Sequence, residues 1–185
     1  MTQLWQAFGN LIPLFLIITI VVGVVGYFMS KKSNLAFKII IINALVGLSI
    51  FGILLVTLYP KYYGTELPRV VNLVPFVGMY ELIFHSVSIS VPILNLGLNI
   101  LLFVPFGFFL SWKISSFKKK LGSRIILSGF LFSFFIELTQ YVVPMDRAAD
   151  IDDLVLNTIG STLGYIIWKI FNEHILYPKN AKTIQ

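Results

Sequence analysis

The sequence contains no cysteine among its 185 residues. This absence excludes disulfides, CxxC redox pairs, thiolate zinc sites and a cysteine nucleophile. The sequence also lacks a Gly-x-Ser-x-Gly motif, a His-Glu-x-x-His motif and a phosphate-binding glycine loop. Enzyme classes that depend on these arrangements are therefore excluded.

Charge is scarce as well. Charged residues make up 12% of the chain and apolar residues 57%, whereas soluble domains are about a quarter charged. We therefore predict an all-α integral membrane protein with a single membrane domain over residues 1–185. Lys and Arg outnumber Asp and Glu by 14 to 8, but the cations lie in short segments between apolar runs. They indicate membrane orientation, and we expect no nucleic-acid partner.

Five apolar stretches are long enough to cross a hydrocarbon core of about 30 Å. They lie near residues 11–29, 39–58, 93–112, 124–143 and 151–171. The connection over residues 59–92 is too long for a hairpin and too polar to span, yet it contains the apolar run VVNLVPF. We predict a short re-entrant or interfacial segment there, followed by a surface helix.

The number of Lys and Arg residues alternates from one connection to the next. The amino-terminal tail has none, and the later segments have three (30–38), two (59–92), five (113–124), one (144–150) and three (from Lys169 onward). The positive-inside rule therefore predicts an amino terminus outside and a carboxyl terminus in the cytoplasm. All acidic residues except Glu173 then belong to the outer half, so we expect any chemistry to face outward.

Three polar side chains are predicted to share one depth. Asn99, Glu137 and Asn157 each lie six residues from the outer end of a span, or roughly 9 Å below the outer boundary at helical rise. At about 100° per residue, three helix faces carry polar stripes. These stripes are Asn95 and Asn99; Ser133, Glu137, Gln140 and Tyr141; and Asp153, Asn157, Gly160 and Gly164. The pattern predicts a common polar pocket open to the exterior.

Arg147 lies in the short link between the last two spans, close enough in sequence to reach over this pocket. Its planar guanidinium suits a carboxylate or a phosphate oxygen. Glu137, as a buried lone carboxylate, would be neutral or would need a cation, and Arg147 is the nearest candidate in sequence.

Structural explanations compete for several of these residues. Asp150 is a good N-cap for the last span, and Asp153 can complete a capping pair. Gly160 and Gly164 are typical of close helix packing, and Asn99 and Gln140 can hydrogen-bond between helices.

Four ordered motifs resemble one family. They are NLVPF (72–76), NILLFVPFG (99–107), IELTQ (136–140) and RAADIDDLVLNTIGSTLG (147–164). Together they resemble the VanZ-like membrane proteins over residues 72–164, while the spans at 11–29 and 39–58 match by hydropathy alone. Asp152 is an addition to the family pattern and is not carried over.

The resemblance implies a bacterial plasma-membrane protein associated with resistance to teicoplanin-type lipoglycopeptides. It does not supply a biochemical activity. By motif position it implies eight site residues: Asn72, Asn99, Glu137, Gln140, Arg147, Asp150, Asp153 and Asn157.

We expect an outer pocket that binds or modifies an envelope lipid or a lipid-linked cell-wall component. Glu137 or Asp153 would be the general base and Arg147 would hold an anion. The binding set would be Asn72, Asn99, Gln140, Asp150 and Asn157. No organic cofactor is expected, although the carboxylates could hold Mg²⁺ or Ca²⁺. The alternative is a non-catalytic protein whose polar network is structural, and which binds a partner or shields envelope precursors.

The predicted topology can be tested on the cysteine-free chain. A cysteine placed at Ala148 should react with a membrane-impermeant thiol reagent added to intact cells, whereas one at Lys119 should react only after permeabilisation. The reverse pattern would invert the topology.

Overall fold

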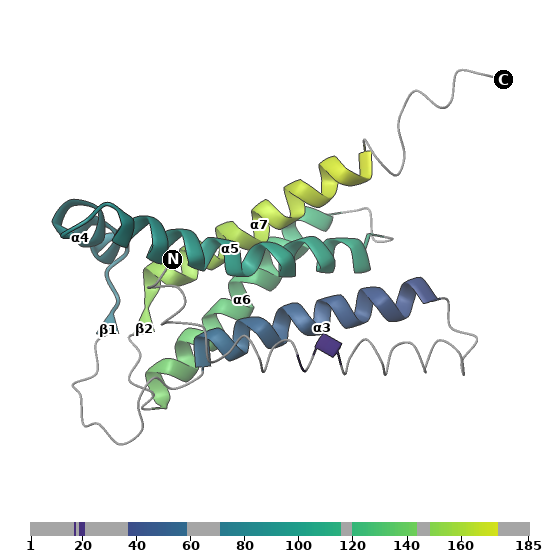
Figure 1. The fold of residues 1–185 in the computed structure, drawn as a ribbon, viewed down its shortest axis with the longest axis horizontal. Helices are drawn as coiled ribbons and strands as arrows, with labels where there is room; N and C mark the ends of the chain where they lie inside the picture. Colours follow the sequence, from purple (N-terminus) through teal and green to yellow (C-terminus); the bar gives the residue numbers. More distant parts are fainter. Residues whose placement is uncertain are drawn as a thin grey trace.

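The computed structural model describes residues 17, 19–20, 37–58, 71–115, 120–143 and 149–173. Four of the described helices are long and apolar enough to cross a membrane. They are α3 (Phe37–Leu58), α5 (Ser90–Lys113), α6 (Leu121–Val142) and α7 (Ile151–Phe171), as Figure 1 shows. A shorter helix, α4 (Val77–His85), precedes α5.

These helices confirm the four later apolar stretches as helices of membrane-spanning length. Two begin three residues earlier than predicted, at Ser90 and Leu121. The first of these differences arises because Pro92 falls in the first helical turn, where its missing N–H breaks no helical bond. The predicted span at 11–29 lies almost entirely outside the described residues.

Two strands of two residues each were not predicted. β1 (Val71–Asn72) and β2 (Ala149–Asp150) pair in parallel, with Val71 opposite Ala149 and Asn72 opposite Asp150. They bring the segment before α4 against the segment before α7. In Figure 1 the two strands and α4 lie at the same end of the helix bundle.

The apolar core joins three spans. Ile53 of α3, Phe103 and Phe106 of α5, and Ile136 of α6 form one buried cluster. A second cluster, nearer the opposite end, packs Leu121 and Ile125 of α6 against Trp168 of α7. Packing among these large side chains holds α3 and α6 beside α5 and α7.

Close contact between α5 and α7 depends on glycine. A Cβ added at Gly160 would overlap the carbonyl oxygen of Ile100, and one at Gly164 would overlap that of Val104. Gly107 of α5 likewise faces the backbone of Ser161 on α7. The expected packing role of Gly160 and Gly164 is confirmed, because only glycine lets two backbones approach this closely.

Gly164→Ala should lower the melting temperature in detergent, because the added methyl group forces α5 and α7 apart at a cost of about 1–3 kcal/mol. Gly97→Ala is the matched control, since a Cβ there would meet no atom within 4 Å. That control should be neutral or stabilising, by up to about 1 kcal/mol from helix propensity. Equal melting temperatures for the two variants would contradict the close contact.

Candidate functional site

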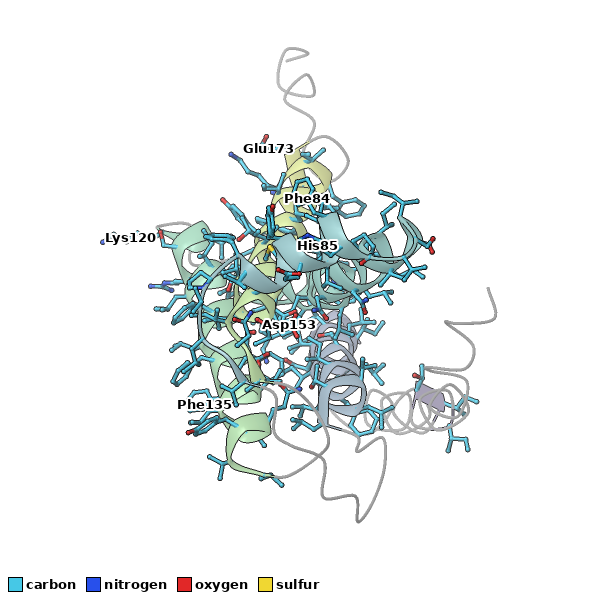
Figure 2. The ribbon with its side chains drawn as sticks, turned by 90° about the vertical axis from the view of Figure 1, so that its left-hand side faces the viewer. Phe84, His85, Lys120, Phe135, Asp153 and Glu173 are labelled. Carbon is cyan, nitrogen blue, oxygen red and sulfur yellow. The ribbon has the colours of Figure 1, made fainter. Side chains whose placement is uncertain are left out.

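Six polar residues gather at the end of the bundle where α4 and the two strands lie. We call this group the polar layer; its members are Asn72, Asn99, Glu137, Asp150, Asp152 and Asp153. They come from β1, α5, α6, β2 and the first turn of α7. Figure 2 views the bundle from this end and shows Asp153 near the middle of the bundle, with Phe84 and His85 of α4 above it in this view. Predicted site residues from distant parts of the sequence are therefore brought together.

Asn72 and Asp150 join the two strands through their side chains. Asn72 Nδ2 donates to Asp150 Oδ1 at 2.9 Å, and Asn72 Oδ1 accepts from the amide of Val74 at 3.2 Å. The strand register places the two residues opposite each other. Asn72 thus fixes both the carboxylate and the turn that leads towards α4.

Asp150 is the N-cap of α7. Its backbone is extended, and its Oδ1 accepts from the amide of Asp152 at 2.9 Å. The capping interpretation of Asp150 is confirmed. In a capping pair, the backbone amide of the N-cap residue donates to a side chain three residues later in the same helix. In this protein the amide of Asp150 donates to Glu137 Oε2 of α6 at 2.9 Å.

Burial raises the pKa of the Asp150 carboxyl above its usual range, and the neighbouring charge of Asp152 adds to this increase. Hydrogen bonds from the amide of Asp152 and from Asn72 act in the opposite direction. The pKa is raised because the buried carboxylate is less well solvated than in water. Removing the side-chain donor of Asn72 should therefore raise the pKa of Asp150 further.

Asp152 is the polar-layer residue that the sequence interpretation missed. Only 2% of its surface is exposed. Its two carboxylate oxygens accept from the amides of Phe76 at 2.5 Å and Met79 at 2.9 Å, at the beginning of α4. No local pattern could have indicated this contact, because donor and acceptor lie more than 70 residues apart.

Asp153 and Asn99 connect α7 to α5. Asn99 Nδ2 donates to Asp153 Oδ1, and both side chains are half-buried. The predicted polar stripes of α5 and α7 meet in this pair, although the depth prediction placed Asn99 level with Asn157, one turn further along α7. Asn99 therefore orients the Asp153 carboxylate from the neighbouring helix.

Asn157 lies one helical turn deeper than Asp153 and contacts α6. Its Nδ2 donates to Ser133 Oγ at 2.9 Å, and 3% of its surface is exposed. Ser133 precedes Glu137 by one turn of α6, so the polar stripes of α6 and α7 meet as predicted. Asn157 Oδ1 is buried with no hydrogen-bond partner among the described atoms.

Gln140 is directed to a different neighbour. Its Nε2 donates to the carbonyl oxygen of Thr57 on α3 at 3.0 Å, and its Oε1 is buried without a partner in the described part of the chain. The structure places this side chain between α6 and α3, whereas Glu137 contacts β2. Gln140 is thus not brought against the carboxylates of α7.

Two further expectations concern ligands. Arg147, the predicted anion holder, lies outside the described residues, so its contact with Glu137 stays a prediction. Within the described ranges, no group of three or more His, Asp or Glu side chains is arranged to hold a metal ion.

The arrangement has a definite chemical character. Backbone and amide N–H groups from other elements fix the carboxylates of Glu137, Asp150, Asp152 and Asp153. Fixed carboxylates of this kind can accept a proton or hold a cationic or hydrogen-bond-donating group. The same bonds also tie the elements to one another, so a binding role and a structural role both fit the geometry.

Comparisons with known proteins agree with the motif resemblance. "Protein VanZ" from Enterococcus faecium is 30% identical over 88 residues, which cover 46% of this chain and 51% of that protein. The chain thus aligns with about half the length of this relative. No solved structure matches the chain. The VanZ/LLP1 family matches residues 46–172, which include every described polar-layer residue, and the chain belongs to this family.

Proposed function

We propose that this protein contributes to resistance to teicoplanin-type lipoglycopeptides through an outward-facing polar pocket. The pocket binds or modifies an envelope lipid or a lipid-linked cell-wall component. Family membership supports the resistance role. The observation that supports a pocket is the gathering of four carboxylates at one end of a membrane bundle.

The proposal includes a topology. The chain crosses the bacterial plasma membrane five times, with the amino terminus outside and the carboxyl terminus in the cytoplasm. This orientation places the polar layer at the outer face, where lipid headgroups and lipid-linked precursors are found. The alternating numbers of Lys and Arg in the connections support it.

The roles of the carboxylates differ. Glu137 and Asp153 are the candidates for a general base, because each is half-buried and accepts a hydrogen bond from an N–H group of another element. Asn99 orients Asp153, and Arg147 is proposed to hold an anionic group of the ligand. Asn72 and Asp150 shape the rim through the strand pair. Asn157 supports the layer from α7 through Ser133, and Gln140 joins α6 to α3.

A second candidate function is structural. The hydrogen bonds that favour it join Asp152 to α4, Asn99 to Asp153 and Glu137 to β2. In this case the polar layer holds the outer end of the bundle together, and the protein acts by binding a partner or by shielding envelope precursors from the drug.

Glu137→Gln and Asp153→Asn separate the two functions. If the pocket is functional, each variant should accumulate in the membrane at the wild-type level, lose most of the teicoplanin resistance, and change the lipid extract measured by mass spectrometry. The reason is that each substitution replaces a carboxyl group, which can accept or release a proton, with an amide of the same shape that cannot.

Glu81→Gln is the matched control, because Glu81 is exposed on α4 and pairs with His85 at 3.0 Å. This control should retain resistance. Loss of the Glu137→Gln and Asp153→Asn proteins from the membrane, with no change in lipid composition, would contradict the pocket and favour the structural function.

Asp152→Ala tests the structural contribution of the layer directly. The substitution leaves the amides of Phe76 and Met79 without their acceptor, so we expect a loss of about 1–3 kcal/mol and a more protease-sensitive α4. Glu173→Ala, an exposed carboxylate at the other end of α7, should change neither thermal unfolding nor proteolysis. An Asp152→Ala protein as stable and as resistant to protease as wild type would show that this contact does not hold α4.

A further inference from the structure

The side of α4 that faces the bundle is marked by Gly78. A Cβ added there would lie 3.0 Å from Asn72 Nδ2 and 3.1 Å from Oδ2 of both Asp150 and Asp152. The absence of a side chain at Gly78 thus lets α4 lie directly over three members of the polar layer. Glu81 and His85, which pair with each other, fall within about 60° of Gly78 around the helix.

The opposite side of α4 is apolar and uncovered. At about 100° per residue, Tyr80, Ile83 and Phe84 point away from Gly78, with 54%, 48% and 67% of their surfaces exposed. No residue of α4 is buried. This distribution is the reverse of that in a helix on a water-soluble protein, where the apolar stripe faces the core.

The exposed apolar surface continues on both sides of α4. Before the helix, Leu73, Val74 and Phe76 are exposed, and after it Val87 and Ile89 are exposed. The surface then continues on the spanning helix α5 at Ile93. It is therefore continuous with a surface that the bilayer covers.

Several backbone N–H groups at the beginning of α4 have acceptors within the protein. The amides of Phe76 and Met79 donate to the buried carboxylate of Asp152, and the amide of Tyr80 donates to the Phe76 carbonyl. In hydrocarbon, each unsatisfied backbone group costs several kcal/mol, so a helix start is tolerated only with such partners. Asp152 supplies the acceptors that solvent would supply elsewhere.

We propose that the outward face of α4, formed by Val77, Tyr80, Ile83 and Phe84, is an interaction surface for the acyl chains of phospholipids. α4 then lies within the leaflet at the polar-layer end of the bundle, with Gly78 towards the carboxylates. The polar layer is covered on this side by α4 and lipid instead of water. This placement of α4 does not depend on the proposed resistance function.

Spin labels test the placement in the full-length protein, which has no native cysteine. Single cysteines at Ile83 and Phe84 would be labelled in vesicles of phosphatidylcholine and phosphatidylglycerol. Collision rates with oxygen, which partitions into lipid, and with a water-soluble nickel chelate would then be measured. A label at Leu127, which is exposed on the spanning helix α6, provides the lipid reference. A label at Glu173, which is exposed just after the end of α7, provides the water reference.

We expect the ratio of oxygen to nickel collisions at Ile83 and Phe84 to lie closer to that at Leu127 than to that at Glu173. A ratio at both positions near that of Glu173 would overturn the proposal, since α4 would then face water. Strongly immobilised labels with dipolar broadening between copies would also overturn it, because a second copy of the chain would then cover the face. None of the labelled side chains is buried, so labelling should leave the fold intact.

Discussion

Buried and half-buried carboxylates that accept hydrogen bonds from N–H groups of other elements are the interaction on which the polar-layer end of this bundle depends. Asp152 accepts from the start of α4, Asp150 accepts from Asn72 and caps α7, and Glu137 accepts from the amide of Asp150. A backbone N–H group that neither water nor an acceptor reaches lowers the stability of the fold. These carboxylates supply the acceptors. The short strands, α4 and the beginning of α7 are consequently held in one place.

The glycine contact between α5 and α7 makes this arrangement possible. Because Gly160 and Gly164 allow the two backbones to touch, Asn99, which is adjacent to the contacting residue Ile100, comes within hydrogen-bonding reach of Asp153 at the beginning of α7. Ser133 and Asn157 form the corresponding link between α6 and α7. Helix packing, which uses no charge, therefore positions the charged groups that the proposed function uses, and the same bonds limit how far those groups can move towards a ligand.

Hydropathy alone predicts the described spans, because each is a continuous apolar run of helical length. Helical geometry predicts that the polar stripes carrying Asn99 and Asp153 face a common site, although it places Asn99 level with Asn157, and capping rules predict the role of Asp150. The pairing of β1 with β2 was not predictable, since two-residue strands carry no periodic pattern and lie far apart in the sequence. The contact of Asp152 with α4 was missed for the same reason. A hydrogen bond between helices was predicted for Gln140, but its partner on α3 was not, because tertiary packing and not local sequence sets which helix it meets.

The carboxylates of the polar layer hold the backbone around them. Amide hydrogen exchange of the protein in lipid nanodiscs measures this directly at Phe76, Met79 and Asp150, whose N–H groups donate to Asp152 and Glu137. We expect protection at these three amides to approach that in the middle of α6 and α7. Exchange at the rate of an unstructured peptide would contradict it.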